Sequence, residues 1–132
     1  MTGGNTIASG KGGVGKMIIT ANLALSLAQR YESEGSIVAV DLDLGCGNLN
    51  ACLGVRSPNG TIDGFLTQKV QNLQQLNGLE ANFTLIDLGA GTSEDLLDIF
   101  LGAGEKIIVV TPESLSLHNA FVFLKSAILR FL

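Results

Sequence analysis

A glycine-rich segment near the start of the chain, residues 9–17, places the tightest constraint on how this sequence can fold. It reads Ser-Gly-Lys-Gly-Gly-Val-Gly-Lys-Met, follows the apolar run Thr6-Ile7-Ala8, and leads into a helical pattern that begins near Lys16. Glycine adopts positive φ angles at low cost and lets backbone N–H groups approach an anion. A helix N-terminus adds unpaired N–H groups and the positive end of its dipole. The order strand, glycine-rich turn, helix therefore predicts a phosphate-binding loop.

The loop fits the P-loop pattern G-x-x-x-x-G-K-[ST] at every fixed position except the last. The residues expected to contact a nucleotide are Gly10, Lys11, Gly12, Gly13, Val14, Gly15, Lys16 and Met17. Lys16 would reach the β- and γ-phosphates. The last position normally supplies a Ser or Thr hydroxyl to Mg²⁺, whereas the Met17 thioether is a soft ligand that Mg²⁺ does not favour. The pattern predicts phosphate binding and leaves hydrolysis open.

The composition is that of a globular domain. The chain has 132 residues, of which 46% are hydrophobic and 15% are charged, so we expect one nucleotide-binding domain over residues 1–132. No apolar run approaches the roughly 20 residues that span a bilayer, and no signal peptide precedes the first strand, which predicts a cytoplasmic protein. A net charge of −4 gives no sign of nucleic-acid binding. Cys46 and Cys52 lack a metal-site spacing and are expected to be reduced thiols, and His118 is expected on the surface.

Hydrophobic patterning predicts strands alternating with helices. Besides the strand before the loop, strands are predicted at 36–42, which suits burial on both faces of a parallel sheet, at 83–87 and, as a further buried strand, at 106–111. Helices are predicted at 17–31, 48–53, 62–67 (with Thr61 as N-cap), 94–101 (with Ser93 as N-cap) and 114–132, and residues 68–82 read as a linker or irregular helix. We therefore expect an α/β fold, in which helices flank a mostly parallel sheet in three layers.

The first and last helices each show an apolar face. In the first helix the recurring residues are Ile19, Leu23, Leu27 and Tyr31, with Ala24 and Ala28 on the same side. In the last helix they are Leu117, Ala120, Phe121, Leu124, Ile128 and Phe131. We expect the last helix to cover the sheet with this face. A helix lying on a membrane surface is the alternative, but its polar face is short of Lys and Arg.

Acidic residues end two of the predicted strands. Alternation places Asp41 and Asp43 on one side of the second strand, and Asp87 closes an apolar strand. In open α/β sheets ligands bind beyond the carboxyl ends of the strands, where these carboxylates would meet Mg²⁺ and an attacking water. A strand that closes on Asp is typical of Walker B, whose carboxylate holds Mg²⁺. The alternative is that these acids simply end their strands.

Three motifs, in this order, resemble the MinD/ParA family of deviant-Walker-A ATPases. They are Lys11-Gly-Gly-Val-Gly-Lys16, Val40-Asp-Leu-Asp-Leu-Gly45 and Ile86-Asp-Leu-Gly-Ala-Gly91. The segments Gly47-Asn-Leu-Asn50 and Thr111-Pro-Glu113 are most similar to the MinD-like branch that includes the flagellar-number regulator FleN/FlhG. The resemblance covers most of the chain, which makes it more specific than a lone glycine-rich loop.

The resemblance implies a role for each site residue. Lys11 would be the signature lysine that reaches the partner's phosphates across an ATP-bound dimer, and Lys16 would bind phosphate within its own subunit. Asp43 would orient the attacking water, while Asp41 and Asp87 would organise Mg²⁺. ATP and Mg²⁺ are the implied cofactors. The implied function is an ATPase switch in cell-division, flagellar or other positioning, which forms a nucleotide-dependent homodimer, recruits an unidentified protein partner and, in full-length relatives, associates with membranes.

Three departures from the family pattern keep other hypotheses open. Met17 replaces Thr or Ser, residues 68–82 look like a deletion across a further strand, and the chain stops at Leu132 before the C-terminal strands and helix of full-length relatives. We therefore expect a truncated or internally shortened domain. The main alternative is a catalytically impaired, non-enzymatic relative that serves as an interaction module. A P-loop kinase or other transferase is less favoured, because no acceptor-binding residues stand out.

Overall fold

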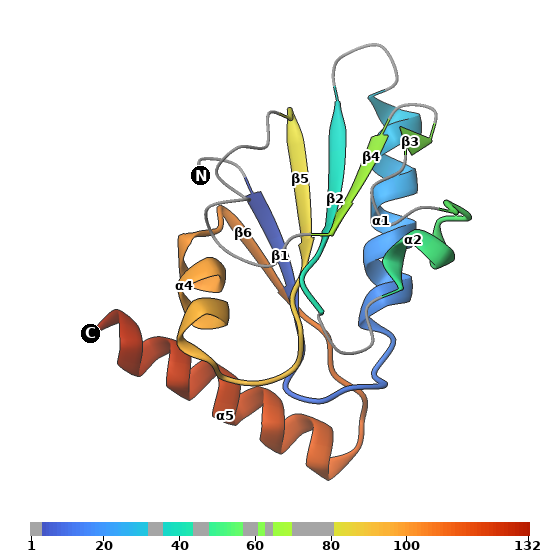
Figure 1. Ribbon diagram of the computed structural model, residues 1–132. Helices are drawn as coiled ribbons and strands as arrows, with labels where there is room; N and C mark the ends of the chain where they lie inside the picture. The colour runs from blue at the N-terminus through green and yellow to red at the C-terminus, as the bar shows by residue number, and fades with distance from the viewer. Residues whose placement is uncertain (1–3, 32–35, 44–47, 57–60, 63–64, 70–80) are drawn as a thin grey trace.

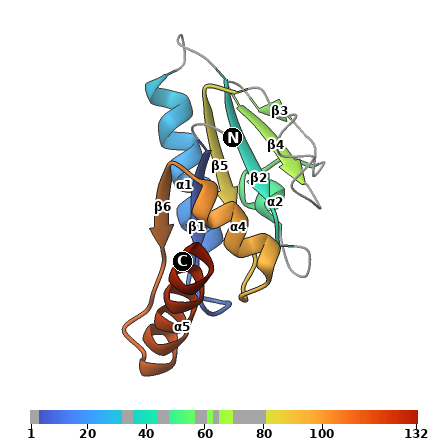
Figure 2. The same ribbon diagram turned by 90° about the vertical axis from the view of Figure 1, so that its left-hand side faces the viewer.

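The computed structural model describes residues 4–31, 36–43, 48–56, 61–62, 65–69 and 81–132. One sheet lies between two layers of helices (Figure 1, Figure 2). The strands are β1 (Gly4–Ala8), β2 (Ile37–Asp41), β3 (Thr61–Ile62), β4 (Phe65–Lys69), β5 (Phe83–Asp87) and β6 (Glu105–Ile108). The helices are α1 (Lys16–Arg30), α2 (Leu49–Cys52), α4 (Glu94–Gly102) and α5 (Ser114–Phe131). This confirms the predicted three-layer α/β fold.

The strand order is β3-β4-β2-β5-β1-β6, and all neighbours are parallel except the short β3, which runs antiparallel to β4. The strand before the phosphate loop, β1, is therefore central. In the register of the sheet Ile7 lies opposite Asp87, and Asp41 lies opposite Asp87 from the other side. Because parallel strands end at the same edge, this pairing brings the two predicted acids to the mouth of the loop.

Each face of the sheet has its own apolar core. Val38 and Val40 of β2 point toward α4 and α5, whereas Ile37 and Ala39 point toward α1 and α2. All four residues are buried, as expected for a parallel strand that is covered on both sides. The prediction that the apolar run at 36–42 forms a strand covered on both faces is confirmed by β2, and the strand predicted at 83–87 is β5, whose second half is buried.

The first helix was placed correctly within one residue, but its predicted buried face is only partly right. The side chains buried under α1 are Lys16, Thr20, Ala21, Ala24 and Ala28. Leu23 and Leu27 pack at the margin of the core, and Ile19 is 40% exposed. Small alanines bring the helix axis close to the sheet, so the larger side chains are displaced to its sides.

The segment 61–69 contradicts the sequence-based expectation. A short helix over 62–67 with Thr61 as its N-cap is predicted, but the described residues of this segment, 61–62 and 65–67, lie in β3 and β4. Residues 68–82 were expected to be a linker or irregular helix, at a deletion across a further strand, but their first two residues, Gln68 and Lys69, belong to β4. β4 pairs with β2 from Ile37 opposite Phe65 to Asp41 opposite Lys69. Hydrogen bonds to β2 outweigh the weak local preference. The rest of the predicted linker, residues 70–80, lies outside the described residues.

The last predicted strand, 106–111, is shorter and more exposed than expected. β6 ends at Ile108, and its first three residues, Glu105, Lys106 and Ile107, are exposed. β6 is the last strand in the sheet order, so it pairs with β1 along one edge and with no described strand along the other. The residue that becomes buried is Val109, which follows the strand.

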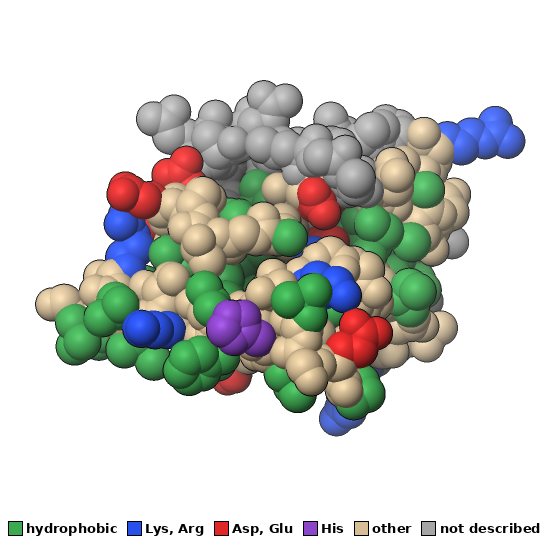
Figure 3. Space-filling view, turned by 90° about the horizontal axis from the view of Figure 1, so that it is seen from below, with side chains coloured by type: hydrophobic (Ala, Val, Ile, Leu, Met, Phe, Trp, Pro, Cys, Tyr) green, Lys and Arg blue, Asp and Glu red, His purple; other side chains and the backbone are tan. Residues whose placement is uncertain are grey.

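The apolar face predicted for the last helix is wrong. The buried residues of α5 are Ser116, Ala120, Phe123 and Ala127. Of the predicted face only Ala120 is buried, and the exposed remainder consists of Leu117, Phe121, Leu124, Ile128 and Phe131. Figure 3 shows apolar side chains gathered around His118, which is exposed as predicted. Within the described parts of the chain, no helix combines the length and apolar character needed to span a membrane.

Contacts with α4 explain this orientation of α5. The Phe123 ring meets the Phe100 ring edge-on, with 4.9 Å between the centroids. Arg130 donates two hydrogen bonds to the Asp98 carboxylate, at 2.5 and 2.8 Å, and this pairing lowers the pKa of Asp98. α5 thus covers this face of the sheet with Phe123 and Ala127, packs against α4 and, as described below, contacts the phosphate loop.

Candidate functional site

The phosphate loop joins β1 to α1 and has the left-handed turns that its glycines were expected to permit. Gly13 has φ 77° and Gly15, the residue before α1, has φ 87°. Non-glycine residues rarely adopt such angles. The buried Ser9 hydroxyl donates a 2.8 Å hydrogen bond to the Lys11 carbonyl oxygen, which closes the first half of the loop. The N-terminal turn of α1 is thereby directed at the space above the loop.

Gly10 has a packing role that cannot be predicted from the sequence. Its backbone does not have a positive φ. A Cβ atom at this position would lie 2.2 Å from the Asn119 carbonyl carbon and 2.4 Å from the Ala120 nitrogen in α5. Gly12, by contrast, has open space around it. Gly10 therefore allows the loop to contact the backbone of α5 directly.

Lys16 lies at the head of the loop and is nearly buried, with 8% of its surface exposed. Its ammonium group donates to the Asp87 Oδ1 at the end of β5. The Thr20 hydroxyl donates a 2.9 Å hydrogen bond to the Lys16 carbonyl oxygen and so supports the first turn of α1. The predicted phosphate-binding lysine and the predicted Walker B acid are thus a buried ion pair in this structure.

Asp87 is fully buried, and its second oxygen, Oδ2, has no hydrogen-bond partner among the described residues. Burial raises the pKa of Asp87. The hydrogen bond and charge of Lys16 oppose this shift, whereas the nearby Asp41 and Asp43 carboxylates add to it. Asp87 is consequently a carboxylate that depends on Lys16 to remain ionised.

This raised pKa leads to a prediction about stability and pH. An acid whose pKa is higher in the folded state contributes stability at low pH that is lost as the pH rises through the folded value. The free energy of unfolding of the native chain, relative to Asp87→Asn, should therefore fall as the pH rises from about 4. Urea unfolding of both proteins between about pH 4 and 7 measures this difference.

Asp98→Asn is the matched control, because it removes an exposed carboxylate whose pKa is lowered by Arg130. A carboxylate whose pKa is lowered in the folded state contributes stability above its unfolded-state pKa, and this contribution is lost as the pH falls. The free energy of unfolding of the native chain, relative to that of Asp98→Asn, should therefore increase as the pH rises. If the difference in unfolding free energy changed in the same direction with pH for both variants, the raised pKa of Asp87 would be contradicted.

Asp41 is buried and held by the backbone. Its Oδ1 accepts a 3.0 Å hydrogen bond from the Asp43 N–H, and its Oδ2 accepts a 3.3 Å bond from the Leu49 N–H at the start of α2. Asp41 thus orders the turn that carries Asp43. Asp43 itself lies beyond the end of β2 and lines the pocket.

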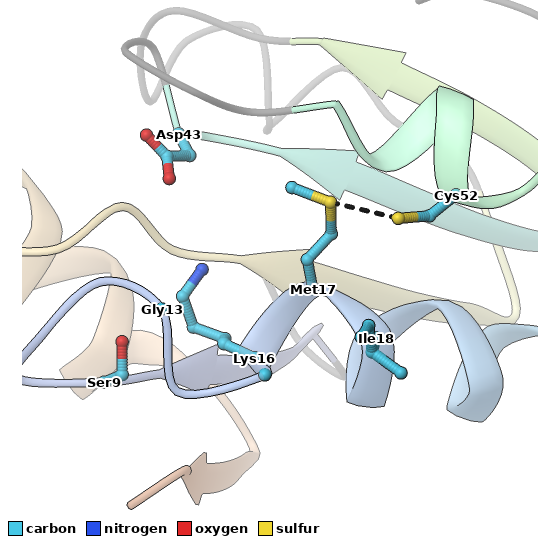
Figure 4. Close-up of a pocket in the computed structure, with 8 residues that line it drawn as sticks. Ser9, Gly13, Lys16, Met17, Ile18, Asp43 and Cys52 are labelled. Carbon is cyan, nitrogen blue, oxygen red and sulfur yellow. Dashed lines mark hydrogen bonds between the residues drawn. The ribbon is translucent and has the colours of Figure 1, made fainter.

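A pocket of ≈ 470 Å³ opens above the loop (Figure 4). Its lining consists of Ser9, Gly13, Gly15, Lys16, Met17, Ile18, Asp43 and Cys52. The structure therefore brings together Lys16, Met17 and Asp43 as expected. Lys11 is more exposed and donates a 3.2 Å hydrogen bond to the Glu113 carboxylate just before α5. A pocket of this size suits a small molecule such as a nucleotide.

Three residues at this site were not identified from the sequence. Ile18 and Cys52 line the pocket, and Glu113 binds Lys11. Glu113 belongs to a segment that carries the family resemblance without a predicted role, and its ion pair with Lys11 joins residues 102 positions apart. Cys52 is a free, exposed cysteine, in agreement with the prediction of an ordinary reduced thiol, and Cys46 lies outside the described residues. No spacing in the sequence indicates that Lys11 pairs with Glu113 or that Cys52 lies at the pocket.

The pattern of the loop implies Mg²⁺, and the residues of the pocket fit it poorly. The Cys52 thiol lies 3.2 Å from the Met17 sulfur, so the position that should offer a hydroxyl offers sulfur (Figure 4). Both Asp41 oxygens accept backbone hydrogen bonds, and Asp87 is paired with Lys16. Asp43 is the acid that lines the pocket. Because Mg²⁺ requires near-octahedral oxygen ligation, the described residues do not form the usual ligand set.

Comparisons with known proteins agree on one family. The ParA family, described as NUBPL iron-transfer P-loop NTPase, matches residues 4–79. The septum site-determining protein MinD of Helicobacter pylori (strain ATCC 700392 / 26695) is 36% identical over 150 aligned positions, which include 87% of this chain and 55% of that protein. The flagellum site-determining protein YlxH of the same organism is 35% identical over 105 positions, which include 76% of this chain and 33% of that protein.

Solved structures give the same result. MinD of Pyrococcus horikoshii OT3, complexed with Mg-ADP, has a TM-score of 0.71 and 26% identity, with 96% of this chain and 66% of that chain covered. The MinC:MinD complex of Aquifex aeolicus has a TM-score of 0.73 and 24% identity, over 93% of this chain and 62% of that chain, which is a likeness of fold. The chain spans about half the length of the MinD relative from Helicobacter pylori.

Proposed function

Because this chain belongs to the MinD/ParA family of P-loop NTPases, we propose that it binds ATP or ADP in the pocket above Lys16 and acts as a nucleotide-controlled switch. The main support is the buried Lys16 ammonium at the head of the glycine loop, beside the N-terminal turn of α1. A cation and free backbone N–H groups that converge on one pocket form an anion site. The septum and flagellum site-determining relatives favour a role in cellular positioning.

The proposal is tested by equilibrium titration. The 132-residue chain is titrated with ATP and with ADP by calorimetry, once with excess Mg²⁺ and once with EDTA. Saturable binding in either buffer supports the proposed site. The absence of binding in both buffers would reject it, because the loop would then be a structural feature without a ligand.

Nucleotide-dependent dimerisation is the second part of the proposal, and Lys11 provides its test. Lys11 lies outside the pocket lining and is paired with Glu113 at the surface. We expect Lys11→Ala to leave ATP affinity within about threefold of the native value, because no pocket contact is lost. If Lys11 acts in trans, dimerisation with a non-hydrolysable ATP analogue should be lost. Any turnover should fall by on the order of 10³-fold.

Sedimentation velocity with and without the analogue measures the dimer. Lys125→Ala is the control, since it removes an exposed lysine of α5 that lies away from the loop. A nucleotide-dependent dimer that persists unchanged in Lys11→Ala would show that the signature lysine has no role across subunits in this chain.

Met17 supports a second candidate, a nucleotide-binding relative that does not hydrolyse its ligand and serves as an interaction module. The Met17 thioether contacts Cys52 where a P-loop hydroxyl is expected. Phosphate release from the native chain and from Met17→Thr distinguishes the two candidates. Mg²⁺-dependent turnover in the native chain would support the ATPase. Turnover in Met17→Thr alone would support the impaired relative.

A further inference from the structure

Two sulfur-containing side chains form the wall of the pocket on which a P-loop protein normally presents a hydroxyl. Met17 is the second residue of α1, and Cys52 is the last residue of α2. Their sulfur atoms are 3.2 Å apart, and both residues line the pocket (Figure 4). Met17 also packs against the buried cluster between α1 and the sheet. The thioether is therefore held between two helices, and it does not extend freely into solvent.

The Met17 and Cys52 side chains provide no ligand atom of the kind that Mg²⁺ prefers. Mg²⁺ is a hard cation that binds oxygen at about 2.1 Å with near-ideal octahedral geometry. A thioether and a neutral thiol are soft ligands, which suit different metals. The first turn of α1 consequently contributes no ligand to a magnesium ion bound beside the phosphates.

The nearby carboxylates do not replace the hydroxyl. Asp41 already accepts hydrogen bonds from the Asp43 and Leu49 backbone on its two oxygens. Asp87 is fully buried, its Oδ1 is paired with Lys16, and its unpaired Oδ2 is enclosed and does not line the pocket. Asp43, which lines the pocket, would have to provide the protein's direct contact with the cation. A nucleotide, by contrast, meets Lys16 and the loop N–H groups whether or not it carries a metal.

We infer that Met17 and Cys52 make nucleotide binding by this chain independent of Mg²⁺, so that the nucleotide binds with similar affinity with and without the metal. The inference rests on the proposed function, because it requires the nucleotide to enter this pocket. Lys16 and the first-turn N–H groups of α1 provide the positive charge that the free phosphates need. Met17 is the specificity-determining residue, because it replaces the hydroxyl through which bound Mg²⁺ would add to the affinity, and Cys52 holds its sulfur against that wall.

The experiment compares the ADP affinity of the 132-residue chain in excess Mg²⁺ and in EDTA by calorimetry. For the native chain the two dissociation constants should agree within about threefold. Met17→Thr restores the hydroxyl and should make Mg²⁺ tighten binding by at least about tenfold. Met17→Leu is the matched control, because it removes the sulfur without adding an oxygen, and it should remain metal-independent. Cys52→Ala should also remain metal-independent, since it supplies no oxygen.

Each result decides the inference. Tightening of the native chain by Mg²⁺ beyond about threefold overturns it, and this arm does not depend on any variant folding. A metal dependence of Met17→Thr equal to that of Met17→Leu, with both variants folded by circular dichroism, overturns the assignment to residue 17. Binding in neither buffer instead rejects the proposed function, so the two failures are distinguishable.

Discussion

Lys16→Met is expected to weaken ADP binding by at least about 100-fold, which corresponds to about 2.7 kcal/mol. Lys16 is the buried cation of the pocket, and methionine has a similar volume without the charge. Charge-assisted hydrogen bonds to phosphate are among the stronger polar contacts in proteins, and their loss is not compensated when water is excluded. Calorimetric titration of the variant measures the change. Lys125→Met is the control, because Lys125 is exposed on α5 and should leave the affinity unchanged.

The same substitution should also lower stability. In the native chain Lys16 donates to Asp87 Oδ1, and the variant leaves a fully buried carboxylate without a partner. Removing one member of a buried ion pair costs about 3–5 kcal/mol at a pH where the other member is ionised. Burial already raises the pKa of Asp87, and the lost lysine removes the interaction that opposes this shift. Acidification should therefore recover part of the lost free energy of unfolding.

A double variant separates binding from folding. Lys16→Met combined with Asp87→Leu removes both charges together, and replacing a buried pair with apolar side chains is often neutral or stabilising. We expect the double variant to unfold at a urea concentration near that of the native chain and still to bind no nucleotide. Native affinity in a folded double variant would contradict the placement of nucleotide phosphates at Lys16.

The second large effect is expected for Gly10→Ala. The added methyl group would lie 2.2 Å from the Asn119 carbonyl carbon and 2.3 Å from its oxygen. These are backbone atoms inside α5, so no side-chain rotation relieves the clash. Overpacking of this kind typically costs about 1–3 kcal/mol, and a contact with rigid backbone belongs at the upper end. We expect a decrease of about 3 kcal/mol in the free energy of unfolding, measured in urea.

Gly12→Ala is the matched control two residues away. Its Cβ atom would meet no heavy atom within 4 Å, and Gly12 does not have a positive φ. Both substitutions reduce the conformational freedom of the unfolded chain to a similar extent, so their difference isolates the contact with α5. Gly10→Ala should also weaken nucleotide binding, because the loop must move away from α5. Equal stability changes for the two variants would show that the loop and α5 do not make the close contact.

Much of the fold was accessible from the sequence because its signals are local. The positions of β1, β2, β5, α1 and α4 follow from apolar runs and helical periodicity. The segment 61–69 was misjudged because β4 is specified by its pairing with β2. The face of α5 was misjudged for a related reason: Phe123 packs against Phe100 of α4, and periodicity does not say which neighbour a helix will meet.

The features of the site also fall into those predictable from the sequence and those that depend on tertiary contacts. Residue types and spacing determined the phosphate loop, Lys16, and the acids Asp41, Asp43 and Asp87 at the strand ends, because parallel strands must end at one edge. Only the tertiary structure decided that Lys16 pairs with Asp87, that Asp41 is held by backbone N–H groups, and that Gly10 is required by the approach of α5.

The loop at residues 9–17 shows this division most clearly. The sequence by itself determined that this loop has the form of a phosphate site and that Met17 departs from the pattern. That Met17 lies against Cys52, 35 positions away, depends on how α1 and α2 pack, which no local pattern encodes. The binding chemistry of one short segment can be predicted from its residue types, whereas a contact between distant segments forms only when the chain folds.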